Sequence, residues 1–328
     1  MKKYIFCLIG IVVLIVGSIL IYNYQKPKSN LEKIRVAEVT HSPFYAPLYV
    51  AIENGYFKDE GIDVDLILTS GADKVSAAVL SKDVEIGFCG PEATIYIYNG
   101  GEKNYLINFA GLTKKDGQFI IARKKNDNFK LSDLNKKEVL VGRLGGMPAI
   151  NFNNALEKNN VDNVKLNYSV EFANLTSAFI SGTGDYVNLF EPNATQLEKM
   201  GFGHIVANVG SLASNVPYTA FNTRLSYYES NPELIKRFNN ALNKGLAYVA
   251  NHNSVEISKI ITKQFPNISL NDLVVIVDNY QKNDTWYLNT SIDKDHFTNL
   301  EDMLIKNKLI DSYVSYDKLV VDLNDSNN

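Results

Sequence analysis

Strand-like and helix-like segments alternate along this chain, and the alternation constrains its fold more than any other feature. After residue 33, short apolar segments such as IRVAEV, IDVDLIL and VEIGFC are separated by segments whose apolar residues recur every three or four positions. APLYVAIENGYF and DKVSAAVLSK are two of these helix-like segments. Strands that alternate with helices form a mainly parallel sheet that is covered on both faces. The sequence therefore predicts an α/β fold.

A second alternating series begins near residue 121. Its strand-like segments include EVLVGR, VKLNYSV, GDYVNLFEP and HIVANV, and AINFNNALEKNN is a helix-like segment between them. After about residue 218 the pattern is mostly helical. We therefore expect two α/β units followed by a helical tail. A cleft between two such units is a common site for a small ligand.

The same kind of turn recurs where a strand ends and a helix begins. It occurs at Ser42-Pro43, at 70–73, at Gly90-Pro91-Glu92, at 145–148 and at Glu191-Pro192. Each helix start presents unpaired backbone N–H groups and the positive end of the helix dipole. In a doubly wound sheet these starts gather at the carboxyl edge of the strands, where ligands bind. Such a cleft suits an anion or a strongly hydrogen-bonding small molecule, although every α/β protein begins its helices in this way.

The N-terminal segment predicts export from the cytoplasm. Lys2 and Lys3 precede an apolar run from Tyr4 to Tyr22, which is roughly long enough to span a bilayer as a helix. A positive start before an apolar run is also typical of a secretory signal. No small-x-small cleavage pattern follows the run, so an uncleaved membrane anchor is favoured over a cleaved peptide, with residues 26–30 as a polar linker. Either interpretation places the rest of the chain outside the cytoplasm.

Composition and residue spacing argue against several classes of function. The formal net charge of -3 does not suit nucleic-acid binding, which needs a basic face. One of the two cysteines, Cys7, lies in the N-terminal run, so Cys89 has no disulfide partner within the folded part. The histidines are scattered without HExxH or paired spacing, so we expect no metal site. An enzyme with a Cys89–His41 thiol–imidazole pair is an alternative, which fast alkylation of the thiol would reveal.

Three stretches carry a resemblance to a known family: HSPFYAPLYVAIENGYFKDEGIDVDLIL, GADKVSAAVLSKDVEIGFCGPEATIYIYNGG and GDYVNLFEPNATQLEKMGFG. Between Ile34 and Lys263 the chain resembles the solute-binding proteins of ABC importers. The branch is the NMT1/THI5-like one, whose members bind nitrate, sulfonates, taurine, thiamine pyrimidine precursors or riboflavin. The resemblance implies a type II periplasmic-binding-protein fold, with two Rossmann-like α/β lobes, two hinge crossings and closure on the ligand. Many Gram-positive members carry a lipid on an N-terminal cysteine, but this chain has no lipobox.

The resemblance also implies a domain arrangement and partners. Residues 1–30 would be the signal or anchor segment and linker, 31–120 with 221–328 one lobe, and 121–220 the other, with crossings near 119–123 and 218–222. The protein would be an extracytoplasmic monomer without a cofactor that captures a small molecule and delivers it to an ABC permease and its ATPase. Two alternatives are an enzyme of the thiamine-pyrimidine type, whose cysteine-rich motif this chain lacks, and a membrane-tethered sensor with a separate signalling partner.

The family's ligand-facing segments map by position onto the strand–helix turns. The expected ligand-binding residues are Ser42, Phe44, Tyr45, Gly71, Asp73, Cys89, Gly90, Pro91, Glu92, Thr113, Lys114, Gly145, Gly146, Met147, Asn188 and Glu191. To these we add the lone tryptophan, Trp286, which either closes one side of the cleft or packs the tail. No catalytic or metal-binding residue is expected.

Several of these residues also have a purely structural interpretation. Phe44 and Tyr45 either stack on a flat ligand or fill the core. Asp73 and Glu92 either contact the ligand or stabilise the helices that they begin. Glu191 has no obvious partner in the sequence, and we expect it to accept a hydrogen bond from an amino or hydroxyl group of the ligand.

The charge of the turns favours one class of ligand. Glu92 and Glu191 at the same sheet edge would repel nitrate or a sulfonate. A neutral or cationic aromatic ligand suits two carboxylates with Phe44, Tyr45 and Tyr96 nearby. The sequence therefore slightly favours a heterocycle resembling a vitamin precursor over a small anion.

Overall fold

The computed structural model of the protein describes residues 31–324. Residues 1–30 and 325–328 lie outside the described part, and with them the expected anchor, the linker and Cys7. Within 31–324, no helix combines the length and the apolar character needed to cross a membrane.

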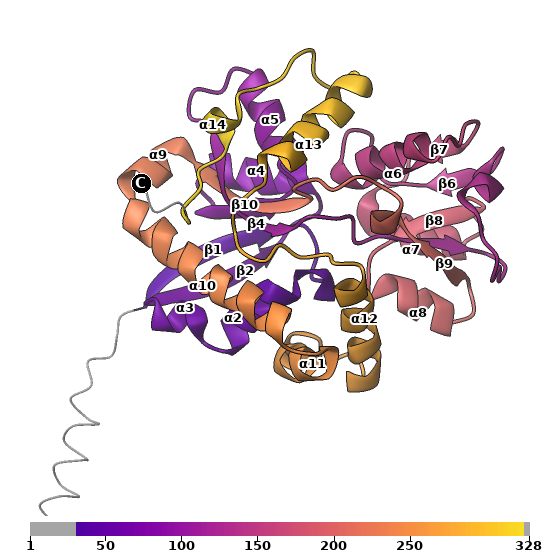
Figure 1. The fold of residues 1–328 in the computed structure, drawn as a ribbon, viewed down its shortest axis with the longest axis horizontal. Helices are drawn as coiled ribbons and strands as arrows, with labels where there is room; N and C mark the ends of the chain where they lie inside the picture. Colours follow the sequence, from indigo (N-terminus) through magenta and orange to yellow (C-terminus); the bar gives the residue numbers. More distant parts are fainter. Residues whose placement is uncertain (1–30, 325–328) are drawn as a thin grey trace, which may run out of the picture. The chain divides into compact units, whose positions relative to one another are not determined.

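The described residues form two five-stranded mixed sheets (Figure 1). The first has the strand order β2 (Ile62–Leu68), β1 (Glu32–Glu38), β3 (Ile86–Cys89), β10 (Thr219–Arg224) and β4 (Leu106–Thr113). The second has the order β7 (Lys165–Asn167), β6 (Glu138–Leu140), β8 (Tyr186–Leu189), β5 (Phe119–Ala122) and β9 (His204–Asn208). Strand β1 is parallel to β3, and β6 is parallel to β7 and β8, as the alternating pattern predicts. We call the units built on the first and second sheets lobe I and lobe II.

Each sheet contains one strand that is antiparallel to both of its neighbours, and the one in the first sheet, β10, comes from after the second sheet in the sequence. β10 pairs antiparallel with β3 and β4, and β5 pairs antiparallel with β8 and β9. The chain therefore crosses between the sheets at residues 114–118 and 209–218. These crossings lie just before the segments 119–123 and 218–222 that were expected to form them. The reason is that FIIA and TAFNTR are fully buried and pair as strands.

Helices cover both faces of each sheet (Figure 1). One side of lobe I is covered by α2 (Ala46–Glu53), α3 (Tyr56–Asp59) and α10 (Pro232–Asn251), and α11 (Ser254–Ile261) packs on α2. The other side is covered by α4 (Ala72–Leu80), α5 (Glu92–Asn99), α13 (Lys294–Lys306) and α14 (Tyr316–Leu319). On lobe II, α6 (Met147–Lys158) covers one face, and α7 (Leu175–Ile180) and α8 (Asn193–Lys199) cover the other. The helical tail also contains α9 (Leu225–Ser230) and α12 (Leu270–Lys282), and the 3-10 turns η1 (Pro43–Tyr45) and η3 (Phe172–Asn174) border the space between the lobes.

Two glycines set the boundaries of helices in lobe I. Gly55 was expected to end the helix in APLYVAIENGYF and does so with a φ of 77°, while the residues after it begin the separate helix α3. Asp73 was expected to cap α4, but the N-cap is Gly71, whose φ of 112° favours glycine over any other residue. Asp73 instead lies in the first turn of α4, where its charge is favourable to the helix dipole.

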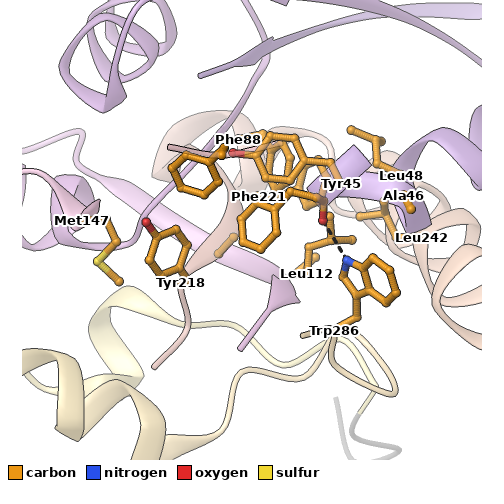
Figure 2. Close-up of a cluster of buried hydrophobic side chains, with 14 of the residues drawn as sticks. Tyr45, Ala46, Leu48, Phe88, Leu112, Met147, Tyr218, Phe221, Leu242 and Trp286 are labelled. Carbon is orange, nitrogen blue, oxygen red and sulfur yellow. Dashed lines mark hydrogen bonds between the residues drawn. The ribbon is translucent and has the colours of Figure 1, made fainter. Parts of the chain in front are cut away.

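An aromatic stack fixes the end of β3 in lobe I (Figure 2). Phe88 on β3 and Phe221 on β10 are register partners, and their rings stack with centroids 4.2 Å apart. The ring of Tyr45 packs edge-on against Phe88 at 4.3 Å. The turn Gly90-Pro91-Glu92 follows directly after this stack, so its position is set by the strand that enters from the other half of the sequence.

Candidate functional site

A pocket lies between the two lobes where several strand–helix turns meet. It encloses about 580 Å³ of space free of atoms, its open mouth included, and we call it the cleft pocket. The turns after β1, β2 and β3 contribute from lobe I, and the turn after β6 contributes from lobe II. Six of the residues expected at the site line it, namely Tyr45, Gly71, Gly90, Glu92, Gly146 and Met147.

Glu92 is the polar side chain that distinguishes the cleft pocket. It is the first residue of α5. Its carboxylate lies against Gly90 in the preceding turn, so closely that a Cβ added at Gly90 would collide with it. Only 1% of Glu92 is exposed, and among the described residues neither carboxylate oxygen has a hydrogen-bond partner. A buried acceptor without a donor is costly, so this carboxylate is prepared for a donor that the folded chain does not supply.

Burial also changes the acidity of this group. Loss of solvation raises the pKa of Glu92 to about 7, against the opposing effects of nearby backbone N–H groups and the charge of Arg143. The backbone N–H of Met147 at the start of α6 is one of these groups, although it makes no hydrogen bond of standard geometry to the carboxylate. Near neutral pH Glu92 can therefore accept a hydrogen bond as a carboxylate or donate one as an acid.

Three contacts join the lobes around the cleft pocket. The hydroxyl of Tyr96 on α5 donates to the carbonyl of Gly145 at 3.0 Å. The hydroxyl of Ser42 donates to the carbonyl of Glu191. Arg143 lies 3.8 Å from Asp73, but its side chain is 42% exposed, so this ion pair is weak. The two sides of the pocket are thus held by directional contacts, together with the buried packing of Phe44 on Phe190.

Aromatic side chains form much of the remaining wall. Phe190 packs against Phe172 with ring centroids 5.8 Å apart, and both line the pocket together with Tyr218. Phe44 touches Phe190, Tyr218 and Tyr45 from behind, is fully buried, and does not line the pocket. Planar aromatic walls of this kind suit a flat ligand.

A second cavity adjoins the cleft pocket at Phe172 and Phe190. This cavity, the outer pocket, encloses about 770 Å³ of space free of atoms, its mouth included. It shares Val39, Thr40, Phe172 and Phe190 with the cleft pocket. It also reaches Ser70, Glu191 and Asn193. The shared residues form a wall that is common to the two spaces.

The carboxylate of Glu191 is occupied by its own helix. Its two oxygens accept from the backbone N–H and the hydroxyl of Thr195, at 2.9 and 2.8 Å. Burial raises the pKa of Glu191, while these two hydrogen bonds lower it. Glu191 therefore has the partner inside the fold that Glu92 lacks.

Cys89 and Trp286 lie outside the cleft pocket. The Cys89 thiol is fully buried, accepts from the Asn222 amide at 3.4 Å, and has a pKa that burial raises. His41 contacts Glu38 at 2.8 Å and the carbonyl of Gln264 at 3.0 Å, so its ring nitrogens have other partners than the thiol. Trp286, only 7% exposed, donates from its indole N–H to the carbonyl of Phe44 at 2.7 Å within lobe I (Figure 2).

The other expected residues also have structural surroundings. Thr113 is buried and bonded to Thr219 at 2.6 Å, and Lys114 pairs with Asp284 at 2.8 Å. Asn188 is fully buried in β8. Pro91 occupies the N-cap of α5, and Asp73 lies at the rim.

Sequence reasoning missed several residues that line the cleft pocket: Thr40, Arg143, Phe172, Phe190, Tyr218 and Thr219. Arg143 carried a signal, since it is a cation between a strand and the Gly145-Gly146 helix start. Phe172 and Tyr218 lie in segments that the fold, not the local pattern, brings to the cleft. Among the described residues, no group of three or more His, Cys, Asp or Glu side chains is arranged to hold a metal ion.

Comparisons with known proteins agree with this architecture. The model of the family described as NMT1/THI5 like matches residues 42–254. A Bacillus subtilis (strain 168) protein named "Putative binding protein YtlA" is 38% identical over 298 residues, covering 90% of this chain and 89% of that protein.

Solved structures show the same fold at low sequence identity. A ligand-binding component of an ABC-type import system from Staphylococcus aureus has a TM-score of 0.72 at 12% identity, covering 90% of this chain and 98% of that one. The alkanesulfonate-binding protein SsuA from Xanthomonas axonopodis pv. citri, bound to MOPS, has a TM-score of 0.67 at 13% identity, covering 88% of this chain and 98% of that one. The nitrate-binding protein NrtA from Synechocystis PCC 6803 has a TM-score of 0.64 at 15% identity, covering 88% and 86%. These likenesses confirm the predicted two-lobed periplasmic-binding-protein fold.

Proposed function

Since the chain belongs to the NMT1/THI5-like family, as its sequence predicted, we propose that it is the extracytoplasmic solute-binding component of an ABC importer. The observation that carries this proposal is the cleft pocket, which is lined from both lobes and holds a buried carboxylate without a partner. The relative from Bacillus subtilis is named as a binding protein, one structural neighbour is named as the ligand-binding component of an ABC-type import system, and others are named as sulfonate- or nitrate-binding proteins. The cleft pocket is thus proposed to capture a small molecule, not to transform it.

The proposed mechanism uses the two crossings as a hinge. Backbone hydrogen bonds join them, from Val209 to Gln118 at 2.9 Å and from Tyr218 to Thr113 at 2.9 Å. The expected bounds shift with the crossings, so that residues 31–113 with 219–324 would move as one lobe and residues 119–208 as the other. A ligand contacts both lobes only when they are closed, so binding shifts the population towards the closed form. The closed form then docks on a permease whose ATPase drives import.

The proposal includes a place in the cell. The apolar run at residues 4–22 would hold the protein at the outer side of the membrane, or would be removed if it is a cleaved signal. The protein would act as a monomer in contact with its permease, and it would not bind nucleic acid.

Two ligand classes fit the cleft pocket. An amino-bearing heterocycle would use Glu92 and the aromatic walls. A small anion such as a sulfonate or nitrate would use Arg143 and the N-termini of α4 and α6, which also line the pocket. The enzyme alternative has less support, since Cys89 and His41 have separate partners, and a sensor would need a signalling partner on another chain.

A thermal-shift screen of the full-length protein tests the proposal. The compounds are sulfonates, nitrate, aminopyrimidines, flavins and other small anions. A ligand that binds only the folded state raises the melting temperature by an amount that grows with the logarithm of its concentration relative to its Kd. A positive compound should also allow co-purification of a permease and an ATPase from membranes of the source cells. Binding without these partners would favour the sensor alternative, and turnover of the compound would favour an enzyme.

A further inference from the structure

We propose that Glu92 is the specificity-determining residue of the cleft pocket and that it selects a flat ligand with N–H donors, neutral or cationic, against small anions. The inference rests on the proposed function, because it names what the same pocket binds. The supporting evidence is the geometry around the carboxylate of Glu92.

The first step is the missing donor. Buried carboxylates in folded proteins are paired or hydrogen-bonded, and the chain supplies such partners to Glu191 and Glu38 in the same region. Neither oxygen of Glu92 has a hydrogen bond of standard geometry to any described residue, although nearby backbone N–H groups, including that of Met147, lower its pKa. Both acceptors are therefore available at once, and a ligand with two neighbouring N–H groups, such as an amidine or an aminopyrimidine, would satisfy them together.

The second step is the charge of the wall. Of the described residues that line the cleft pocket, only Glu92 and Arg143 carry a formal charge. Arg143 is 42% exposed and lies 3.8 Å from Asp73, so its charge is partly screened and partly balanced. Lys114 and Lys115, at the first crossing, both lie within 4 Å of Asp284 and do not line the pocket. An anion in this space would thus meet a buried carboxylate, opposed only by the partly balanced charge of Arg143 and the partial charges at the N-termini of α4 and α6.

The third step is the shape of the wall. Tyr45 stands against Phe88 on one side, while Tyr218 and Met147 face the pocket on the other (Figure 2). Phe190 and Phe172 line both the cleft pocket and the outer pocket. Aromatic faces and a thioether make favourable contacts with a planar ring and give little to a compact, strongly hydrated anion.

The test uses four probes on the full-length protein in detergent at pH 8, where Glu92 is mostly ionised. Benzamidine and 4-aminopyrimidine carry N–H donors on a flat ring, whereas benzoate has the shape of benzamidine with the opposite charge, and ethanesulfonate represents the small anions. We expect titration calorimetry to show binding of at least one donor probe and of neither anion. E92Q should weaken that donor probe by about tenfold or more, because a charge-assisted hydrogen bond is lost.

The control is E301Q, which removes another buried carboxyl outside the cleft, on α13, where it accepts from the backbone of Val314. Its affinity for the donor probe should equal that of the wild type. The inference is overturned if an anion binds the wild type as tightly as the donor probes do, if E92Q leaves donor affinity unchanged, or if no donor probe binds. An anion that binds and closes the cleft would overturn the inference while the proposed function stands. The absence of any ligand in the wider screen, together with the absence of a permease partner, would overturn both.

Discussion

The carboxylate of Glu191 accepts hydrogen bonds from both the backbone N–H and the hydroxyl of Thr195, four residues later in the chain. It therefore folds back onto its own helix. Glu191 stands before the N-cap Pro192 of α8, whereas Glu92 follows the N-cap Pro91 and is the first residue of α5. The residue four positions after Glu92 is Tyr96, whose phenol donates across the cleft to Gly145. The two glutamates thus have different roles, since one stabilises a helix start and the other is left facing the cleft pocket.

Thr195→Val should destabilise the protein without removing the ligand site. The change deletes the hydroxyl that satisfies one oxygen of the buried Glu191 carboxylate, so we expect a loss of about 1–2 kcal/mol in the free energy of unfolding. Urea denaturation measures it. Thr298→Val is the matched control, because its hydroxyl bonds an exposed backbone carbonyl on α13, and it should cost less than about 0.5 kcal/mol. Equal costs for the two substitutions would show that the Glu191–Thr195 contact adds no stability.

Glu92→Gln should stabilise the empty protein, and more so at higher pH. The pKa of Glu92 is raised to about 7 from an ordinary value of 4.5, so the folded state holds this proton more tightly than the unfolded chain does. The resulting penalty on folding is small below about pH 4, grows as the unfolded carboxyl ionises, and is complete above about pH 7. We expect the difference in unfolding free energy between E92Q and wild type to grow by about 2 kcal/mol from pH 5 to pH 8.

Denaturant titrations of both proteins at the two pH values measure this difference. Asp116 is also buried with a pKa raised to about 7, but it is present in both proteins and its contribution cancels. A difference that stays constant with pH would mean that Glu92 ionises normally in the folded protein.

Tyr96→Phe should favour the open form. The substitution keeps the ring and removes the hydroxyl that bonds Gly145 across the cleft at 3.0 Å. We expect an affinity for the ligand about 2- to 10-fold weaker, since one neutral hydrogen bond of the closed form is lost. Small-angle scattering should show a larger radius of gyration for the empty protein. Tyr98→Phe, on the same helix with its ring packed on Tyr105 in lobe I, should change neither quantity. If both variants behave alike, the Tyr96 contact does not hold the lobes together.

The pattern of the sequence was sufficient for the fold class but not for the way the sheets are completed. The segment IDVDLIL forms β2 at the expected place because its alternation and its flanking turns are local signals. The pairing of Phe88 with Phe221 joins residues that are far apart in the chain, and no local pattern encodes it. The return of β10 to the first sheet also sets the place of the second crossing and brings Tyr218 to the cleft. This long-range pairing explains why Tyr218 was missed as a site residue.

The site was predictable at the level of turns and not at the level of side-chain direction. The turns with Gly71, Gly90 and Gly146 do reach the cleft pocket, since helix starts gather at one sheet edge. Whether Glu92 or Glu191 faces the ligand depends on whether the chain itself provides a hydrogen-bond donor to its carboxylate. A threonine four residues after Glu191 was a readable sign that this carboxylate would be used internally.

Cys89 should react with alkylating agents only when the protein unfolds. Its thiol is fully buried and its pKa is raised by burial and by the charge of Glu92, so almost no thiolate is present at neutral pH. Labelling with iodoacetamide and mass spectrometry of the peptide that contains Cys89 would separate it from Cys7. The labelling rate should follow the fraction unfolded in urea. Rapid labelling in the absence of urea would instead support a reactive thiol and the enzyme alternative.

Gly90→Ala should impair ligand binding while leaving the fold nearly intact. The new Cβ would occupy the space now filled by the Glu92 carboxylate, which is the far end of a flexible side chain and can rotate away at little cost. We expect the melting temperature of the empty protein to change by only a few degrees, as for a loss of about 1 kcal/mol or less. Affinity for the ligand should fall as far as in E92Q, because the carboxylate no longer faces the pocket. Gly101→Ala is a suitable control for a glycine substitution, since a Cβ there meets no atom within 4 Å and the position is remote from the pocket lining, although its φ of 82° adds some strain. Full affinity in Gly90→Ala would mean that the orientation of Glu92 does not determine binding.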